Sequence, residues 1–152
     1  LYENSDEPYC EELAKAITDE IRRGNRIDTT TKLRNVIEKT LDFLPNNKEK
    51  KDIIKKTCQR TFQALRIDVN NEFEVLYEFM EKLPGALKPG GRVAILTFHS
   101  GEDKLVKKAL KAGYKEGIYS EYARDVVRPS AQECAQNGRA RSTKMRWAVK
   151  AE

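Results

Sequence analysis

The chain has 152 residues, of which 39% are hydrophobic and 35% are charged, and its formal net charge at pH 7 is +5. This length fits one domain or two small ones, and the composition is typical of a helix-rich globular protein. No apolar run approaches the roughly 18 residues of a membrane-spanning helix, and no signal peptide opens the sequence, so we expect a cytoplasmic protein without a membrane partner. The sequence starts at Leu1 in the middle of a pattern, which predicts a segment of a longer protein.

The cysteines and the charge distribution narrow the kinds of ligand to expect. Cys10, Cys58 and Cys134 are far apart and form no C-x-x-C pair, so we expect neither a metal site nor a disulfide framework. Acids outnumber bases eight to four in residues 1–30, whereas bases outnumber acids twelve to six in residues 101–150. This asymmetry favours a polyanionic partner for the second half of the chain.

Apolar residues at helical spacing predict that the first part of the chain is entirely helical. Gly24 and Pro45 mark the ends of the first two helices, and Asn70 is a candidate cap for the last one. The expected helices cover residues 8–23, 29–44, 51–67 and 70–83. Because no single amphipathic helix buries a core alone, we expect these helices to pack on one another.

Residues 93–98 form a continuous apolar run, which predicts a centrally placed parallel strand. His99 and Ser100 follow at the carboxyl end of this strand, where ligands bind in open α/β sheets. The capping-box spacing of Ser100 and Asp103 predicts that the next helix begins at Ser100. Since the N-terminus of a helix favours negative charge, this junction is a candidate site for an anionic group.

Two more strands are expected over residues 119–127 and 142–149, with a short helix between them that starts at Ser130 and ends before Gly138. The predicted fold class is therefore α/β, with a small all-helical domain followed by an incomplete doubly wound sheet. Half of such a sheet leaves the strand at 93–98 with an uncovered edge, so we expect self-association through that edge.

Three segments share their residues and their order with one known family. They are TCQRTFQALRIDVNNE at 57–72, LKPGGRVAILTFHSGED at 87–103 and RPSAQECAQNGRARS at 128–142, followed by MRWA at 145–148. Together they resemble the bacterial RsmH/MraW family, which uses S-adenosylmethionine to methylate the exocyclic amine of a cytosine in small-subunit ribosomal RNA. The likeness is looser in residues 1–50, which are similar to the family's inserted helical domain.

The resemblance implies an incomplete class I methyltransferase (Rossmann-like) sheet, with this chain as the carboxyl-terminal portion. It implies a helical substrate-recognition domain at residues 1–56 and the second half of the methyltransferase domain at residues 57–152. The family's glycine-rich cofactor loop is absent, so we expect no residue here to bind S-adenosylmethionine, and we assign no catalytic residue. Gly101 replaces the leucine usual in FHSLED, which we expect to loosen the start of that helix, and Gly138 replaces the proline usual before RARS.

Contacts with RNA are predicted at six residues, because guanidinium groups suit phosphate oxygens and an imidazole can bond a base edge. These residues are Arg60, Arg66, His99, Ser100, Arg139 and Arg141. Some have structural alternatives: His99 could bond a neighbouring loop, and Ser100 could serve only as a helix cap. Likewise, Arg66 could pair with an internal acid, and Arg139 could be merely exposed.

We interpret the chain as part of an S-adenosylmethionine-dependent methyltransferase that acts on a cytidine of small-subunit ribosomal RNA and is inactive as this fragment. Two other interpretations stay open. The chain could be a non-catalytic RNA-binding module, or it could be a purely structural or dimerising domain. Only the last predicts no salt-sensitive binding of RNA.

Overall fold

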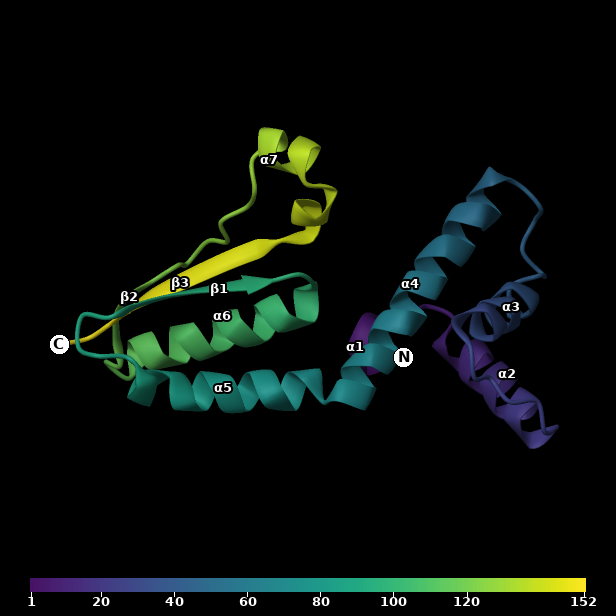
Figure 1. The fold of residues 1–152 in the computed structure, drawn as a ribbon, viewed down its shortest axis with the longest axis horizontal. Helices are drawn as coiled ribbons and strands as arrows, with labels where there is room; N and C mark the ends of the chain where they lie inside the picture. The colour runs from purple at the N-terminus through teal and green to yellow at the C-terminus, as the bar shows by residue number, and fades with distance from the viewer. The chain divides into compact units, whose positions relative to one another are not determined.

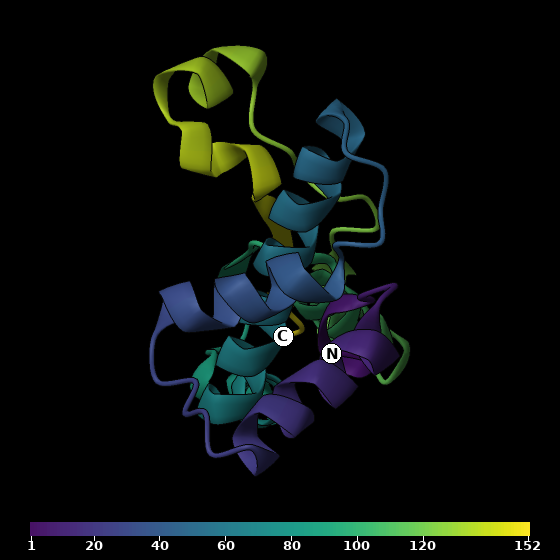
Figure 2. The same cartoon turned by 90° about the vertical axis from the view of Figure 1, so that its right-hand side faces the viewer.

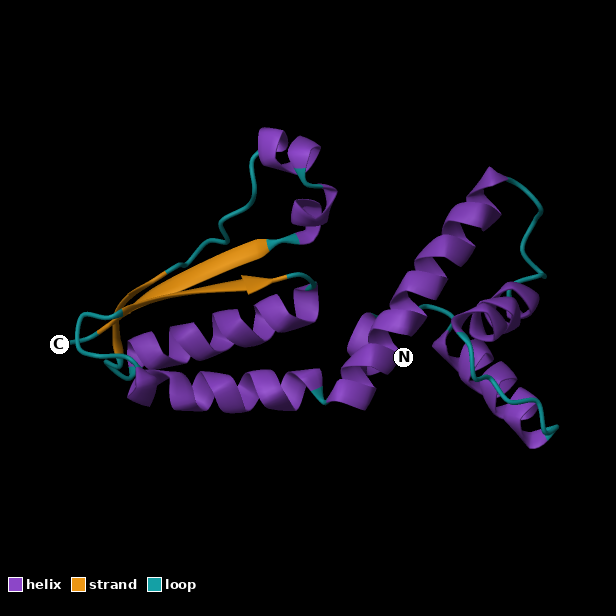
Figure 3. Cartoon of the chain, viewed as in Figure 1, coloured by secondary structure: helices purple, strands orange, loops and turns teal.

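The computed structural model describes residues 1–152, which form two compact units, Leu1–Asn71 and Glu72–Glu152 (Figure 1). The first unit is entirely helical, and the second combines helices with a small sheet (Figure 3). The helices of the first unit are α1 (Tyr2–Ser5), α2 (Cys10–Arg22), α3 (Thr30–Thr40) and α4 (Lys48–Asn70). The second unit contains, in chain order, α5 (Glu72–Ala86), β1 (Arg92–Thr97), α6 (Ser100–Lys115), β2 (Tyr119–Tyr122), α7 (Ala131–Gln136), the 3-10 helix η1 (Gly138–Ser142) and β3 (Lys144–Lys150).

The helical unit buries the apolar stripes of its helices, as the sequence predicts. Figure 2 shows α2 and α3, which pack against each other. Thr29 and Asn47 cap α3 and α4, because their side chains accept hydrogen bonds from backbone N–H groups of the first turn. The buried core of this unit consists of Leu13, Leu33, Ile37 and Leu41. The helices predicted for the first part of the chain are therefore confirmed, with α1 in addition.

The long helix α4 is continuous, and the compact units of the structure divide at a different residue from the expected functional domains. The boundary predicted after residue 56 falls inside α4, where Thr57 and Ile67 are both buried. Because burying these residues ties the second half of α4 to the helical unit, the two compact units divide after Asn71. Asn70, predicted to cap the next helix, is instead the last residue of α4. Asn71 ends the helix in the left-handed conformation, with φ 50°.

The sheet has the strand order β1-β3-β2, and both strand pairs are antiparallel. Within this chain the strand predicted to be central and parallel is an edge strand: β1 pairs only with β3, which is antiparallel to it and lies in the centre. Since β1 and β2 are both antiparallel to β3, they run in the same direction, as the helical crossover between them requires. β3 then lies between them and pairs with both, so the chain forms a small antiparallel sheet within an α/β unit.

Helices cover one face of this sheet. α6 packs against all three strands, and α5 packs against α6 (Figure 1). The buried core of the unit consists of Met80, Leu83, Val106, Leu110, Tyr119 and Ala148. The outer edge of β1 has no neighbouring strand, and Leu96 of this strand is 57% exposed. The uncovered edge that the sequence predicts at this strand is thus present.

The predicted strand at 119–127 is shorter in the structure. β2 ends at Tyr122, and Val127 makes only an isolated bridge to Met145. Just after β2, the backbone N–H of Ala123 still donates to the Trp147 carbonyl at 2.8 Å, whereas the carbonyl oxygens of Ala123 and Arg124 accept hydrogen bonds from the Arg146 side chain. In the same structure, none of the helices is long and apolar enough to cross a membrane.

Candidate functional site

The candidate site lies in the second unit, at the end of the sheet where β1 finishes. The pairing of Thr97 with Lys144 aligns the end of β1 with the start of β3. The residues that follow β1 and those that precede β3 therefore leave the sheet at the same end (Figure 1). The antiparallel pairing of β1 with β3 thus brings the start of α6 and the arginines of η1 to one end of the sheet. Four of the predicted residues lie here, namely His99, Ser100, Arg139 and Arg141.

The helix α6 is capped by a histidine rather than by the predicted serine. The backbone N–H of Glu102 donates to Nδ1 of His99 at 3.4 Å. In return, a Glu102 carboxylate oxygen accepts from the backbone N–H groups of Phe98 at 2.9 Å and His99 at 3.4 Å. The capping box is therefore formed one residue earlier than the serine-based spacing suggested. Ser100 is the first residue of the helix and is exposed.

Gly101 makes room for an aromatic ring that packs on His99. The Phe73 and His99 rings meet edge to face, with centroids 5.8 Å apart. A Cβ atom on residue 101 would lie 2.7 Å from Cζ of Phe73, closer than real Cβ contacts. The expectation that glycine loosens the start of this helix is wrong, because α6 begins with an intact capping box. Glycine instead permits the close approach of the Phe73 ring.

Two carboxylates surround the histidine ring. Glu72, His99 and Glu102 each offer a ligand atom, and these atoms all lie within 4.8 Å of one another. Nε2 of His99 is 3.5 Å from a Glu102 oxygen. Because Nδ1 accepts the capping hydrogen bond, the proton of the neutral ring is on Nε2. In that tautomer Nε2 carries a proton and offers no lone pair to a metal ion.

A buried ion pair fixes α6 on the sheet, and the sequence analysis missed one of its two members. Nε of Arg146 donates to Asp103 at 2.7 Å, and Nη2 donates to the other carboxylate oxygen at 3.2 Å. Arg146 is only 5% exposed, so this charge is desolvated. The hydrogen bonds from Arg146 are the main reason why the pKa of Asp103 lies below its usual value. The alternation of apolar residues along β3 gave no signal that Arg146 is buried.

Arg139 and Arg141 lie in η1, and both are exposed. Two interactions fix the backbone of the turn that carries these arginines. The Asn137 side chain accepts a hydrogen bond from the Arg139 backbone N–H at 3.1 Å, and the Ala140 side chain between the two arginines is buried. The backbone is thus anchored while the two guanidinium groups reach solvent, which suits contact with phosphate.

The other two predicted arginines belong to the helical unit, on α4. Nη1 of Arg60 lies 3.9 Å from a carboxylate oxygen of Glu7, which is fully buried. Arg60 therefore offsets an internal charge as well as presenting a partly exposed side chain. Arg66 is an exposed residue near the end of α4, where its backbone carbonyl accepts a hydrogen bond from the Asn70 side chain at 2.9 Å.

Proteins similar in sequence to this chain belong to one class, the methyltransferases. The relatives of this chain are named as methyltransferases of small-subunit ribosomal RNA. One from Agathobacter rectalis is 90% identical over 152 residues, which are 100% of this chain and 43% of the relative. One from Lachnoclostridium phytofermentans is 71% identical over 151 residues, 99% of this chain and 41% of that protein. A more distant one from Rickettsia prowazekii is 35% identical over 167 residues, 99% of this chain and 52% of the relative.

The family follows from a match along nearly the entire chain. The family model described as "MraW methylase family" matches residues 1–151. The chain therefore belongs to the MraW methylase family, as the resemblance of its motifs implied. It spans about half the length of these curated relatives or less.

Proposed function

We propose that this chain is part of an S-adenosylmethionine-dependent methyltransferase that modifies the exocyclic amine of a cytidine in small-subunit ribosomal RNA. Membership of the MraW methylase family and the names of the relatives support this proposal. The observation that carries it is the end of the sheet at β1, where exposed Arg139 and Arg141 lie at the same end as the start of α6. We assign contact with the RNA to this end.

In this proposal, S-adenosylmethionine is held by residues outside this chain. The reason is that the motifs present here include no glycine-rich loop after a strand. The 152 residues alone are therefore inactive in this proposal. They work as part of a larger protein, which we place in the cytoplasm. Their role is to bind RNA and to orient the segment that carries the target amine. Orientation of this kind lowers the barrier because the reacting atoms are held in place before the reaction.

Replacing both Arg139 and Arg141 with glutamine should weaken the binding of single-stranded RNA and make it less sensitive to salt. Each phosphate contact with a single strand contributes about 0.7 to the slope of log K against log salt, so the slope should fall by about 1.4. Fluorescence anisotropy of a labelled RNA, measured over a series of salt concentrations, gives this slope. A matched variant carries the same change at Lys111 and Lys115, two exposed lysines of α6.

The Lys111/Lys115 variant should bind RNA almost as the parent chain does, because these residues lie in the second half of α6, away from its start. An equal loss in both variants would mean that net charge alone governs the binding. Absence of salt-sensitive RNA binding by the parent chain would contradict the proposed role of the chain and favour a structural domain.

We also propose that this chain self-associates through the uncovered edge of β1. Light scattering should then show a dimer that Leu96→Lys converts to monomer, because the added charge would be desolvated at that edge. Val75→Lys is the matched control, since Val75 is 60% exposed on α5 and Leu96 is 57% exposed on β1. A parent chain that is monomeric at all concentrations would contradict this part of the proposal.

A further inference from the structure

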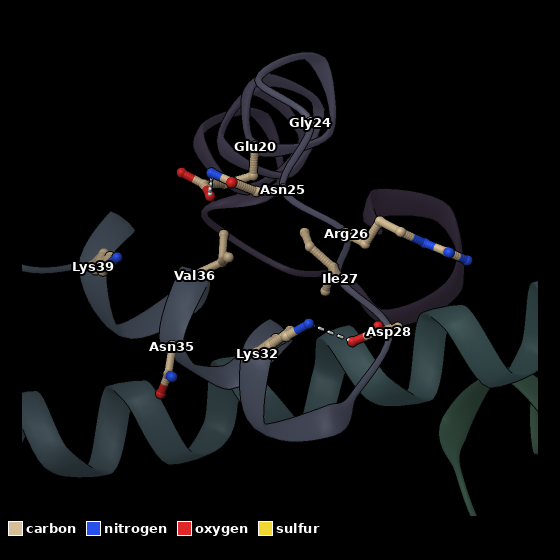
Figure 4. A pocket seen from close by; sticks show the side chains of 10 residues that line it. All are labelled: Glu20, Gly24, Asn25, Arg26, Ile27, Asp28, Lys32, Asn35, Val36 and Lys39. Carbon is tan, nitrogen blue, oxygen red and sulfur yellow. Dashed lines mark hydrogen bonds and ion pairs between the residues drawn. The ribbon is translucent and has the colours of Figure 1, made fainter.

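The helical unit contains a cavity of about 480 Å³ between the end of α2 and the face of α3. Ile27 and Val36 face each other at its centre (Figure 4). Val36 is buried and Ile27 is half-buried, so the two form an apolar floor. Its volume lies in the range of about 300–1,000 Å³ that is usual for small-ligand sites, and one nucleotide fits this range. Around the two apolar residues the lining is mostly polar and charged.

The polar groups around this floor leave an excess of positive charge. Both carboxylates in the lining already have partners: Asp28 accepts from Nζ of Lys32 at 2.7 Å, and Glu20 accepts from the Asn25 side chain at 2.8 Å. An arginine outside the lining, Arg23, also lies 3.7 Å from Glu20. The two acids of the cavity are thus offset by neighbouring donors, and they do not cancel its remaining cations.

The remaining cations of the lining are Arg26 and Lys39. Both side chains are exposed, and in Figure 4 they project on opposite sides of the apolar floor. The structure shows no ion pair for either of them. A polyanion that lies across the apolar floor would therefore have a positive charge near it on each side of the floor.

We propose that this cavity holds one unpaired nucleotide of an RNA strand, with its base against Ile27 and Val36 and its flanking phosphates near Arg26 and Lys39. Lys32 uses one of its three donors on Asp28 and has others for the ribose or the base edge. An unpaired base is required because single-stranded RNA presents its base faces, whereas a duplex hides them in the stack. This proposal rests on the proposed function, since it takes the substrate of the protein to be RNA.

The test compares two cavity variants, two matched controls and the Arg139/Arg141 variant of the complete chain, with a short fluorescein-labelled single-stranded RNA of mixed sequence as the probe. Lys39→Gln should weaken binding about threefold to tenfold and lower the salt slope by about 0.7, because it removes one phosphate contact. Ile27→Ala should weaken binding to a similar extent of about threefold to tenfold with an unchanged slope, since it removes an apolar contact. The matched controls are Lys15→Gln and Ile21→Ala, which change exposed residues of α2 outside the cavity.

The controls should bind the probe as the parent chain does, and circular dichroism should show that Ile27→Ala keeps its helices. If Lys39→Gln and Ile27→Ala bind like the parent while the Arg139/Arg141 variant is weakened, the cavity proposal is overturned and the proposed function stands. If the parent chain binds no RNA, both are overturned. If the chain binds a duplex RNA of the same length with equal affinity, the proposal that the cavity holds an unpaired nucleotide is overturned.

Discussion

Replacing Asp103 with alanine is expected to lower the free energy of unfolding of the second unit by about 3–5 kcal/mol at pH 7. The reason is that Arg146 would keep its buried charge without the carboxylate that accepts its hydrogen bonds. Trp147 is the only tryptophan and lies on β3 in this unit, so its fluorescence during urea unfolding reports the change. Asp125→Ala is the matched control, because Asp125 is an exposed acid of the same unit.

The loss should depend on pH in one direction. The pKa of Asp103 in the folded chain lies below its ordinary value of 3.8, first because of the hydrogen bonds from Arg146. The stabilisation is therefore complete above the pKa of the unfolded chain and is lost as the pH falls through the lower, folded value. The difference between the parent and Asp103→Ala should shrink below about pH 4.

A second substitution tests whether the two residues act as a pair. Replacing Arg146 with methionine in the Asp103→Ala background removes the unpaired charge, so the double variant should be more stable than Asp103→Ala alone. Additive losses in the two single variants would contradict the pairing. An effect of Asp103→Ala no larger than that of Asp125→Ala would do the same.

Gly101→Ala should destabilise the second unit by about 1–3 kcal/mol, although alanine usually stabilises a helix. The added methyl group would lie 2.7 Å from Cζ of Phe73, so the ring or the helix must move. Gly85→Ala is the matched control, because Gly85 lies in α5 with nothing within 4 Å of its Cβ position. That variant should be neutral or more stable by up to about 1 kcal/mol. Thermal unfolding followed by circular dichroism measures both.

Rescue separates a local clash from a general effect on the helix. Phe73→Leu removes the ring atoms that crowd residue 101, so it should make Gly101→Ala less costly. If the double variant is as unstable as the sum of the two single variants, the Phe73 ring is not the cause. Gly101→Leu, which restores the residue usual in the family motif, should be costlier than Gly101→Ala in the background of Phe73.

The elements of the fold were largely predictable from sequence, whereas their arrangement was not. Helical spacing located the helices of the first unit, and the apolar run at 93–98 located β1. A run of apolar residues does not reveal strand order, however, because a strand at an edge can be as apolar as a central one once another protein segment covers it. The central position of β3 depends on long-range pairing that no local pattern encodes. The division between the two compact units after Asn71 was not predicted either. The helical periodicity of α4 continues through residue 57 and gives no sign of where a unit ends.

The motifs of the candidate site could be found in the sequence. The contacts that their residues make with one another could not be predicted from it. The motifs singled out His99 and Arg141 separately, and only the antiparallel pairing of β1 with β3 shows that both lie near one sheet end, since one follows β1 and the other precedes β3. The spacing rule favoured Ser100 as the cap, since it does not include histidine, whose Nδ1 can accept the same hydrogen bond. Arg146 was overlooked because a charged residue on a strand is normally exposed, and only the structure shows the carboxylate and carbonyls that receive it.

The middle position of β3 has a consequence for synthesis of the protein. β1 and β2 have no hydrogen bonds to each other in this sheet, so within these 152 residues neither has a partner strand until residues 144–150 have left the ribosome. The helical unit involves no later residue in its core and can form while the rest is still being translated. The helical unit can therefore form before the sheet, whose three strands pair only once residues 144–150 are available.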